Sequence, residues 1–310
     1  MTLLNETARG VYVIAVTPFT ENGGLDLDSA DRMVEFYLEK GATGLTLLGM
    51  MGEAPKLTTD ESRILVRRVL ARTAGRVPIV VGVSGPGLAA MDELTRAVMD
   101  DGAAGVMVAP PGTLRTDDQI VSYYDMVAEA VGAATPLVLQ DFPLSTGVQI
   151  TPAVISKIVG RLPNVVMLKH EDWPGLAKLT AIRAASDKGT VRRISILVGN
   201  GGVFLPEELT RGADGAMTGF AYPEMMVDVW RAHTAGDVER AHDLFDAHLP
   251  LARYEQQPGP GLAIRKYILA KRGAIASPAL RKPGAALSAA DIVDVERLIS
   301  RQTRRLKEIG

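Results

Sequence analysis

The sequence predicts a (β/α)8 barrel followed by additional helices. Short apolar runs alternate with longer stretches of helical periodicity, and eight such runs occur before residue 225 of the 310-residue chain. Most of these runs are apolar throughout, which is typical of parallel strands that are buried on both faces. Eight consecutive units of similar length favour closure into a barrel. A doubly wound open sheet is the alternative.

The predicted strands are short and rich in aliphatic residues, many of them β-branched. In chain order they are Val11–Val16, Leu45–Leu48, Pro78–Val83, Gly105–Ala109, Pro136–Leu139, Val165–Leu168, Ile194–Val198 and Gly215–Thr218. The sequence after residue 225 contains no comparable run. We therefore expect residues 1–224 to form the barrel and residues 225–310 to form a helical extension packed on it, with a loop at residues 256–261.

Local signals mark where the intervening helices begin and end. An apolar stripe at helical spacing predicts the first helix and consists of Ala30, Met33, Val34, Tyr37 and Leu38. Thr58 and Glu61 form a capping box at the start of the second helix. Thr151 and Pro152 supply an N-cap and a proline at the first helical position. Glycines suited to left-handed C-terminal caps follow three helices, at Gly41, Gly102 and Gly212.

The composition excludes several kinds of chemistry. The chain has no cysteine, four histidines and a formal net charge of −2, so we expect neither a thiolate site nor a nucleic-acid-binding surface. His242 and His248 are six residues apart, which does not match the zinc pair of a helix, and no metal site is predicted. The amino-terminal sequence lacks the features of a signal peptide, and no apolar run approaches a membrane span. We expect a soluble, cytoplasmic protein that does not contact membranes.

Barrel enzymes carry their chemistry on the loops that follow the carboxyl ends of the strands. The candidate residues at these positions are Gly49, Met50 and Met51 after the second strand, Ser84 after the third, Gln140 and Asp141 after the fifth, Lys169 and Glu171 after the sixth, and Gly199 and Asn200 after the seventh. We expect the catalytic groups and the substrate contacts to come from this set.

Lys169 directly follows an apolar strand, so its alkyl stem should leave the core with little solvent around it. Burial favours the neutral amine, which attacks a ketone to form a Schiff base. The alternative is a lysine that extends from the strand end into solvent. Glu171 shares a face with Lys169 if the strand geometry continues, and it is then a candidate base. The alternative for Glu171 is an exposed loop carboxylate.

The remaining candidates are binding residues. Gln140 is an amide suited to holding a substrate hydroxyl, and a turn residue is the alternative. The glycine-containing loops at residues 49–53 and 199–202 offer backbone N–H groups to a carboxylate or phosphate, although such turns are common in barrels. His170 alternates away from Lys169, so we predict a structural role for it.

As an ordered set, these residues resemble the dihydrodipicolinate synthase / N-acetylneuraminate lyase family of class I Schiff-base lyases. The resemblance covers nearly the whole chain and rests on the segments Ala15–Phe19, Gly24–Asp26, Gly49–Glu53 with Leu57 and Glu61, Asp141–Pro143 with Thr146–Gly147, Leu168–Lys169, Gly199 and Gly212–Gly215. It implies a TIM barrel, an imine-forming role for Lys169, a 2-keto acid substrate, no metal or organic cofactor, and assembly as a tetramer or dimer.

The sequence departs from the family pattern at five positions. Met50 and Met51 replace the two residues that are usually threonines. The resemblance places Gln140 and Gly112 where two proton-relay tyrosines usually lie. Ser145 falls where dihydrodipicolinate synthases have an arginine for their aldehyde substrate. These changes argue against dihydrodipicolinate synthase activity.

The pattern resembles the L-2-keto-3-deoxyarabonate dehydratase branch more closely. That branch has a Gln-Asp-x-Pro segment on strand five, a Lys-x-Glu triplet on strand six and an Ala-Met-Thr-Gly segment on strand eight, which match residues 140–143, 169–171 and 216–219. The resemblance implies a dehydratase in which Glu171 carries the proton and Gln140 positions the leaving hydroxyl. A pyruvate-dependent aldolase or synthase is one alternative, and a sugar-acid-binding barrel without catalysis is another.

Overall fold

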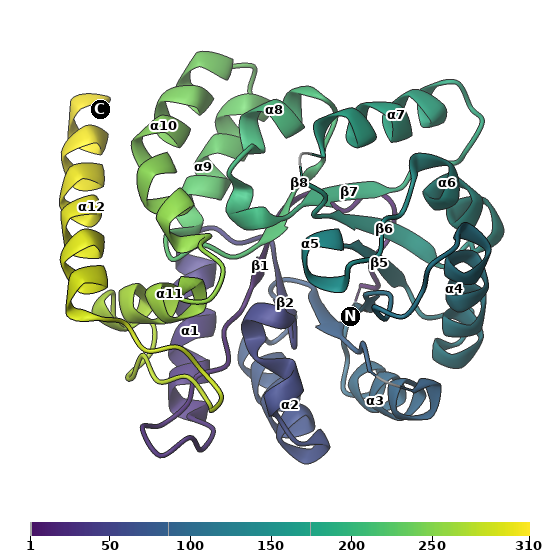
Figure 1. Ribbon diagram of the computed structural model, residues 1–310, viewed down its shortest axis with the longest axis horizontal. Helices are drawn as coiled ribbons and strands as arrows, with labels where there is room; N and C mark the ends of the chain where they lie inside the picture. Colours follow the sequence, from purple (N-terminus) through teal and green to yellow (C-terminus); the bar gives the residue numbers. More distant parts are fainter. Residues whose placement is uncertain (1, 86, 174) are drawn as a thin grey trace.

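The chain folds into a closed parallel barrel, as the sequence predicts (Figure 1). The computed structural model describes residues 2–85, 87–173 and 175–310. The strands hydrogen-bond in chain order, and β8 pairs with β1 to close the ring. They are β1 Gly10–Ile14, β2 Gly44–Leu47, β3 Ile79–Gly82, β4 Gly105–Val108, β5 Leu137–Asp141, β6 Val165–His170, β7 Ser195–Val198 and β8 Gly215–Thr218.

Helices connect the strands and surround the barrel. They are α1 Leu27–Glu39, α2 Thr59–Thr73, α3 Leu88–Asp100, α4 Asp117–Val131, α5 Pro143–Thr146, α6 Pro152–Arg161, α7 Leu176–Asp187, α8 Leu205–Thr210 and α9 Pro223–Thr234. The capping box of Thr58 and Glu61 and the N-cap at Thr151 are both present. Gly41, Gly102 and Gly212 have positive φ angles, as predicted for C-terminal caps.

Three further helices form the carboxyl-terminal extension. They are α10 Val238–Glu255, α11 Gly261–Lys271 and α12 Ala289–Glu308. The predicted division at residue 224 falls inside α9, the helix that follows β8, so the helices added to the eight-unit barrel begin with α10. α12 lies beside α10 at the edge of the molecule in Figure 1, whereas α11 lies close to the barrel.

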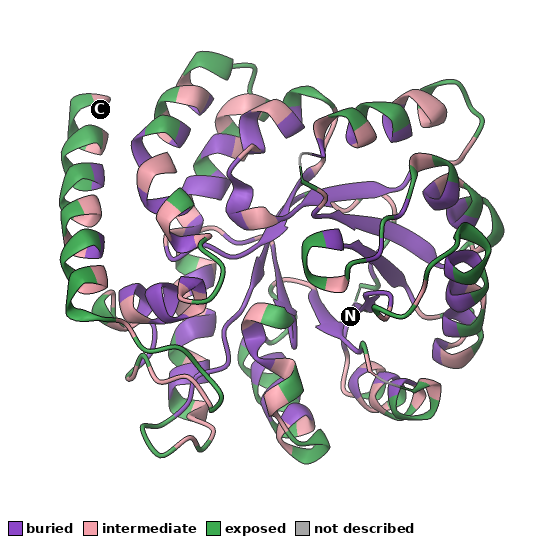
Figure 2. Cartoon of the chain, viewed as in Figure 1, coloured by how far each residue is buried: buried purple, intermediate pink, exposed green. Residues whose placement is uncertain are grey.

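Two layers of apolar side chains pack on the two sides of the strands. The strands are buried along their length, as the purple ribbons of Figure 2 show. Most of the apolar side chains lie between the strands and the surrounding helices. A smaller cluster fills the barrel interior and includes Tyr12, Ile14, Val80, Met107, Val138, Met167, Leu197 and Met217. Because side chains alternate along a strand, this inner cluster identifies which positions at the strand ends face the barrel axis.

The described part of the chain contains no helix that combines the length and the apolarity needed to cross a lipid bilayer.

Candidate active site

Lys169 and Glu171 meet inside the barrel, where alternation places them. Met167 belongs to the inner apolar cluster, and Lys169 and Glu171 follow it at intervals of two residues on the same face. The Lys169 Nζ atom lies 2.9 Å from Oε1 of Glu171. Both residues are buried, with 4% and 5% of their surfaces exposed. Lys169 therefore does not extend into solvent, and Glu171 is not an exposed loop carboxylate.

Gln140 completes this group from the neighbouring strand β5. It pairs in register with Lys169, and it follows the inward-facing Val138 by two residues. Its Nε2 atom donates a hydrogen bond of 2.7 Å to the same Oε1 atom of Glu171. The amide thus fixes the carboxylate beside the amine, and the amide oxygen of Gln140 accepts no hydrogen bond from the described residues.

The loop after β7 makes room for Glu171. A Cβ atom on Gly199 would lie 2.2 Å from Cγ of Glu171, so any larger residue would displace the carboxylate. Asn200 follows in the same loop and donates from Nδ2 to the backbone oxygen of Glu171 at 3.1 Å. Gly199 therefore supports the site because it leaves room for the side chain of Glu171. Asn200 both holds Glu171 and lines the cavity.

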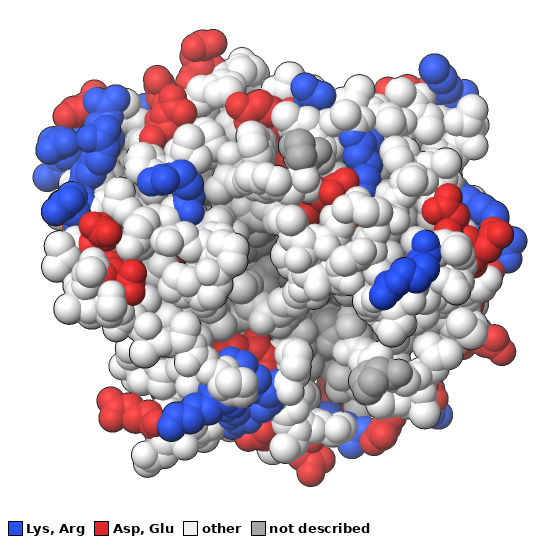
Figure 3. All heavy atoms as spheres, viewed as in Figure 1, with Lys and Arg blue, Asp and Glu red and all other residues white. Residues whose placement is uncertain are grey.

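A cavity of about 70 Å³ opens beside these groups. Its lining consists of Ile14, Met50, Met51, Gln140, Phe142, Lys169, Glu171, Asn200, Gly201, Thr218, Gly219, Gln256 and Arg265. The face drawn in Figure 3 is hollowed near its centre, and its charged side chains lie mainly around the rim. A larger cavity of about 350 Å³ has no lysine or carboxylate among its described lining residues, which are Thr2, Leu3, Leu4, Asn5, Thr7, Ala8, Tyr12, Gly75, Arg76, Val77 and Pro78.

The prediction that Asp141 contacts substrate is wrong. Asp141 follows Leu139 by two residues on the helix-facing side of β5, so its side chain points away from the barrel axis. It is fully buried there, where its Oδ2 atom accepts a hydrogen bond of 2.8 Å from Lys178 on α7. His170 lies on the same side, with Nδ1 3.6 Å from this carboxylate and Nε2 3.0 Å from the oxygen of Gly175. The structural role predicted for His170 fits this position.

Ser84 is also outside the cavity. Its hydroxyl oxygen accepts a hydrogen bond of 2.8 Å from the backbone N–H of Ala109, so it joins the ends of β3 and β4. It lines a separate hollow with Leu48 and Pro55. The strand-end position alone predicted a substrate contact, but Ser84 bonds to the neighbouring strand and does not line the cavity beside Lys169.

The loop after β2 forms a short 3₁₀ turn at Met50–Gly52. Met51 and Met50 line the cavity, although Met50 is 38% exposed and its sulfur accepts a hydrogen bond of 3.0 Å from Ser145. Gly49 precedes the turn and packs against Ile14 without lining the cavity. The Thr17 hydroxyl donates to the backbone oxygen of Gly52 at 2.5 Å, which fixes the end of the turn.

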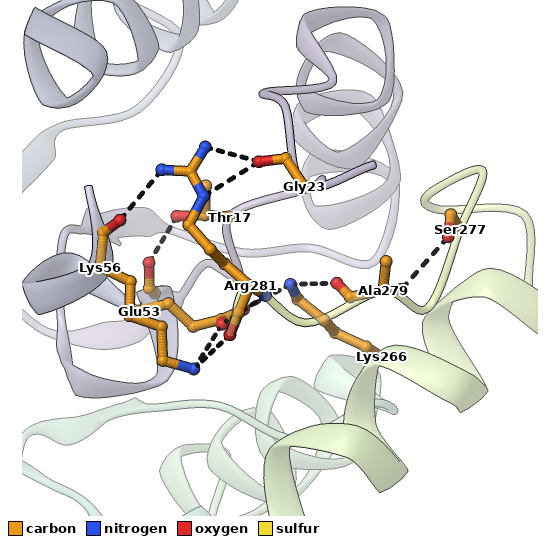
Figure 4. Close-up of polar contacts among 9 residues, drawn as sticks. Thr17, Gly23, Glu53, Lys56, Lys266, Ser277, Ala279 and Arg281 are labelled. Carbon is orange, nitrogen blue, oxygen red and sulfur yellow. Dashed lines mark hydrogen bonds and ion pairs between the residues drawn. The ribbon is translucent and has the colours of Figure 1, made fainter. Parts of the chain in front are cut away.

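An ionic cluster around the buried carboxylate of Glu53 attaches this loop to the extension (Figure 4). The Glu53 carboxylate accepts hydrogen bonds from Lys266 Nζ at 2.6 Å, from Lys56 Nζ at 2.8 Å and from the backbone N–H of Arg281 at 3.1 Å. Lys266 also donates to the oxygen of Ala279. Desolvation lowers the pKa of Lys266, and the hydrogen bond to Glu53 opposes that shift. We call Glu53, Lys56, Lys266 and Arg281 the loop cluster.

Three polar residues of the cavity were not predicted from the sequence. Thr218 ends β8, and its hydroxyl accepts a hydrogen bond from the backbone N–H of Gly201 at 2.8 Å. Gln256 and Arg265 come from the extension, whose docking on the barrel the sequence does not specify. The sequence does carry one signal for the burial of Arg265. Leu269 follows it at a spacing of four, and Ile264 and Ile268 lie beside them on the same helix. An apolar stripe of this kind predicts that the helix face is buried.

Comparison with known proteins assigns the chain to a family. The model of the dihydrodipicolinate synthetase family matches residues 7–302. The chain belongs to this family. Its members are class I aldolase-type lyases, and the resemblance inferred from the strand-end residues is therefore confirmed.

The proteins similar to this chain are named for two different activities. An L-2-keto-3-deoxyarabonate dehydratase of Azospirillum brasilense is 31% identical over 279 residues, covering 89% of this chain and 88% of the relative. A 4-hydroxy-tetrahydrodipicolinate synthase of Thiobacillus denitrificans is 29% identical, covering 91% and 93%. The crystal structure of a dihydrodipicolinate synthase from Rhodopseudomonas palustris is 51% identical, with a TM-score of 0.95 and coverage of 97% and 100%.

Proposed function

We propose that this chain is a hydro-lyase that dehydrates a 2-keto-3-deoxy sugar acid through a Schiff base on Lys169. The observation that carries the proposal is the buried contact between Lys169 Nζ and Glu171 Oε1 at 2.9 Å, with Gln140 bound to the same oxygen. A nucleophilic amine needs a neighbouring group that takes and returns protons, and Glu171 is in hydrogen-bonding distance for that task.

Imine formation uses both charged groups. Glu171 accepts a proton from the Lys169 ammonium, and the neutral amine attacks the C2 carbonyl carbon of the substrate to form a C–N bond. Glu171 then returns the proton to the C2 hydroxyl, which leaves as water, so that a protonated imine remains. The positive charge on the imine acidifies the C3–H bond.

Elimination follows at C3 and C4. Glu171 removes a proton from C3 to give the enamine, and the electron pair of the enamine expels the C4 hydroxyl, which takes the proton and leaves as water. Gln140 positions this hydroxyl through its amide oxygen. Addition of water to C2 of the unsaturated imine then frees the product and the Lys169 amine. The overall reaction removes one water molecule from the substrate.

The turn at Met50–Gly52 and the residue Asn200 are the proposed substrate contacts around this centre. The first N–H groups of a helical turn have no acceptor inside the turn, so those of Met50 and Met51 are suited to an anionic oxygen. Asn200 Nδ2 is held by the backbone oxygen of Glu171, which places the amide at the cavity wall.

Dehydration is favoured over carbon–carbon cleavage by the proton-transfer groups at hand. A retro-aldol reaction needs a base at the C4 hydroxyl while the C3–C4 bond breaks. Among the described residues that line the cavity there is no tyrosine, and Glu171 is the acid–base group in contact with Lys169. The similarity to a keto-deoxy sugar acid dehydratase over 89% of the chain supports the same choice.

A synthase that joins pyruvate to an aldehyde is the second candidate. The relative from Rhodopseudomonas palustris favours it, since that protein is described as a dihydrodipicolinate synthase and is 51% identical. Both candidates begin with the same imine, so product analysis is needed to separate them.

Trapping and product analysis test the proposal together. The protein is incubated with a 2-keto-3-deoxy sugar acid or with pyruvate, reduced with borohydride and digested for peptide mass spectrometry. We expect an adduct on Lys169 and, in the unreduced reaction, loss of water without release of pyruvate. Absence of an adduct with every keto acid would refute the Schiff base. Release of pyruvate, or condensation of pyruvate with an aldehyde, would refute the dehydratase.

A further inference from the structure

A second and larger space of about 690 Å³ adjoins the cavity that holds Lys169. We call it the outer hollow, and its described lining residues are Trp173, Val203, Phe204, Leu249, Arg253, Tyr254, Gln256, Gln257 and Pro258. Gln256 also lines the cavity beside Lys169, so its side chain belongs to the walls of both spaces. The two spaces therefore meet at this residue.

The same three segments of the chain form both spaces. After β6, Glu171 lines the inner cavity, and Trp173 lines the outer hollow two residues later. After β7, Gly201 lines the inner cavity, and Phe204 lines the outer hollow three residues later. At the end of α10, Gln256 lines both spaces. Because each segment continues from one space to the other, the outer hollow extends the inner cavity toward the surface.

The side chain of Gln256 lies across the loop after β7, at the boundary of the two spaces. A Cβ atom on Gly201 would lie 2.1 Å from Nε2 of Gln256, so the glycine leaves room for this amide. The backbone N–H of Gln256 is used at the end of α10, where it donates to the oxygen of Ala252 at 3.1 Å. A side-chain amide both donates and accepts hydrogen bonds, so Gln256 is suited to a hydroxyl group of a ligand that passes this boundary.

Aromatic and aliphatic side chains form most of the outer hollow. Trp173 is 45% exposed, and its ring packs against that of Phe204 with the centroids 4.9 Å apart. Val203 and Leu249 add aliphatic surface, and the described lining contains no carboxylate. Apolar walls with a few polar groups are typical of small-molecule sites, and the second ring holds the exposed tryptophan in place. The outer hollow is therefore suited to the carbon chain of an uncharged group.

The inner cavity is too small to hold a whole sugar acid. Its volume is about 70 Å³, whereas sites for small molecules usually measure about 300–1,000 Å³. The reacting carbons C2, C3 and C4 have to lie beside Lys169, Glu171 and Gln140. The carbons beyond C4 then have to leave the inner cavity, and the outer hollow, at about 690 Å³, has the volume to receive them.

We infer that the outer hollow binds the part of the substrate beyond C4, where Gln256 bonds a hydroxyl group and Trp173 packs against the carbon chain. This inference rests on the proposed function and narrows its substrate class. A five-carbon acid has one carbon beyond C4 and would leave most of the outer hollow empty. The substrate class is therefore uncharged 2-keto-3-deoxy sugar acids of six or more carbons.

The test measures borohydride trapping on Lys169, as loss of the unmodified Lys169 peptide, against the concentration of three 2-keto acids. They are pyruvate, the six-carbon sugar acid 2-keto-3-deoxygluconate, and 2-ketohexanoate, which has six carbons and no hydroxyl group beyond C2. In the wild type we expect the sugar acid to reach half-saturation at a concentration about 10-fold below that of pyruvate, with 2-ketohexanoate between them, because each added contact contributes about 1 kcal/mol.

Two variants separate the two contacts, and each result is expressed as a ratio to the half-saturating concentration of pyruvate. In Trp173→Ala we expect the ratio to rise about 5- to 10-fold for both six-carbon acids, since apolar contact is lost. In Gln256→Met it should rise by a similar factor of about 5- to 10-fold for the sugar acid alone, since the amide is lost and the bulk is kept. Met126→Ala removes a 47% exposed apolar side chain of α4 and should keep every wild-type ratio.

The outcomes distinguish this inference from the proposed function. Unchanged ratios in both variants, or equal half-saturation by pyruvate and the sugar acid in the wild type, would overturn the outer hollow as part of the substrate site. A rise for 2-ketohexanoate in Gln256→Met as large as that for the sugar acid would overturn the hydroxyl contact. Failure of the wild type to trap any keto acid would instead refute the Schiff base of the proposed function.

Discussion

The molecule contains two buried ionic groups near the barrel mouth, and they differ in how fully their atoms are satisfied. In the loop cluster, Glu53 accepts two lysines and a backbone N–H, and Lys266 also donates to a carbonyl oxygen. In the cavity, Lys169 and Gln140 share a single oxygen of Glu171, and Nη1 of Arg265 has no hydrogen-bond partner among the described residues. In the first group both oxygens of Glu53 already accept hydrogen bonds, whereas the residues of the second group line a cavity. Burial of charge alone therefore does not identify a reaction centre.

The largest expected effect of a substitution in either group is the loss of turnover when Lys169 is replaced. Replacement by methionine removes the amine but keeps the bulk, so no imine forms. We expect turnover to fall by about 10⁴-fold or more, a loss typical of a missing nucleophile. Turnover of the sugar acid and the borohydride adduct should disappear together. A Lys169→Met variant with measurable imine trapping elsewhere in the cavity would place the nucleophile on another residue.

Glu171 tests whether the cavity group transfers protons or only pairs charge. The Glu171→Gln variant keeps the shape and the contacts to Lys169 and Gln140 but cannot carry a proton. We expect kcat to fall by about 10²- to 10⁴-fold, the range for loss of a general base. The adduct on Lys169 should still form when borohydride is added over long incubations. A variant with full turnover would remove Glu171 from the mechanism.

Substitutions in the loop cluster should lower the free energy of unfolding of the protein. Glu53→Gln leaves Lys266 buried without a charge partner, and we expect a loss of about 3–5 kcal/mol in the free energy of unfolding, measured by urea denaturation. The double variant Glu53→Gln/Lys266→Met removes both charges and should recover most of that loss. If Glu53→Gln unfolds with wild-type stability, the cluster does not hold the loop to the extension.

Glu208 on α8 extends the comparison to a buried carboxyl group without an ionic partner among the described residues. Burial raises the pKa of Glu208 to about 8, and the nearby Glu207 adds to the shift. The folded protein therefore keeps this proton up to about pH 8, whereas the unfolded chain releases it near its ordinary pKa of about 4.5. Stability contributed by this group is present below about pH 4.5 and is lost as the pH rises toward 8.

The Glu208→Gln variant removes that pH dependence. We expect the variant and the wild type to have similar stability near pH 5, and the variant to be more stable at pH 8 by roughly 3–4 kcal/mol. Urea denaturation at the two pH values measures the difference. An equal gain at both values would mean that the carboxyl group does not titrate with unfolding.

The sequence predicted the parts of the fold and site that depend on local pattern. The strands, the capping box at Thr58 and the pairing of Lys169 with Glu171 follow from apolar runs and from alternation along a strand. The same alternation places Asp141 on the side of the strand that faces the helices, because it follows the inward-facing Gln140 by one residue. The prediction that Asp141 contacts substrate did not take this alternation into account.

Residues whose positions depend on tertiary packing could not be predicted from local sequence pattern. Arg265 and Gln256 reach the cavity only because α10 and α11 dock against the barrel mouth, and nothing in their local sequence specifies that docking. Ser84 resembles the residues that line the cavity in its position after a strand, yet its hydroxyl bonds to Ala109 at the end of the neighbouring strand. Strand-end position predicts which residues are available, and packing decides which of them face the cavity.

Arg265 and Lys266 are consecutive residues of α11, and one lines the cavity while the other anchors the loop after β2. The eight-unit barrel is for this reason not a separable module. A chain that ended after α9 would retain every strand and Lys169, but Glu53 would lose two of its partners, Lys266 and Arg281, and the barrel mouth would lose its guanidinium. Exchange of loops between relatives of this chain therefore has to carry the matching α11 segment with it.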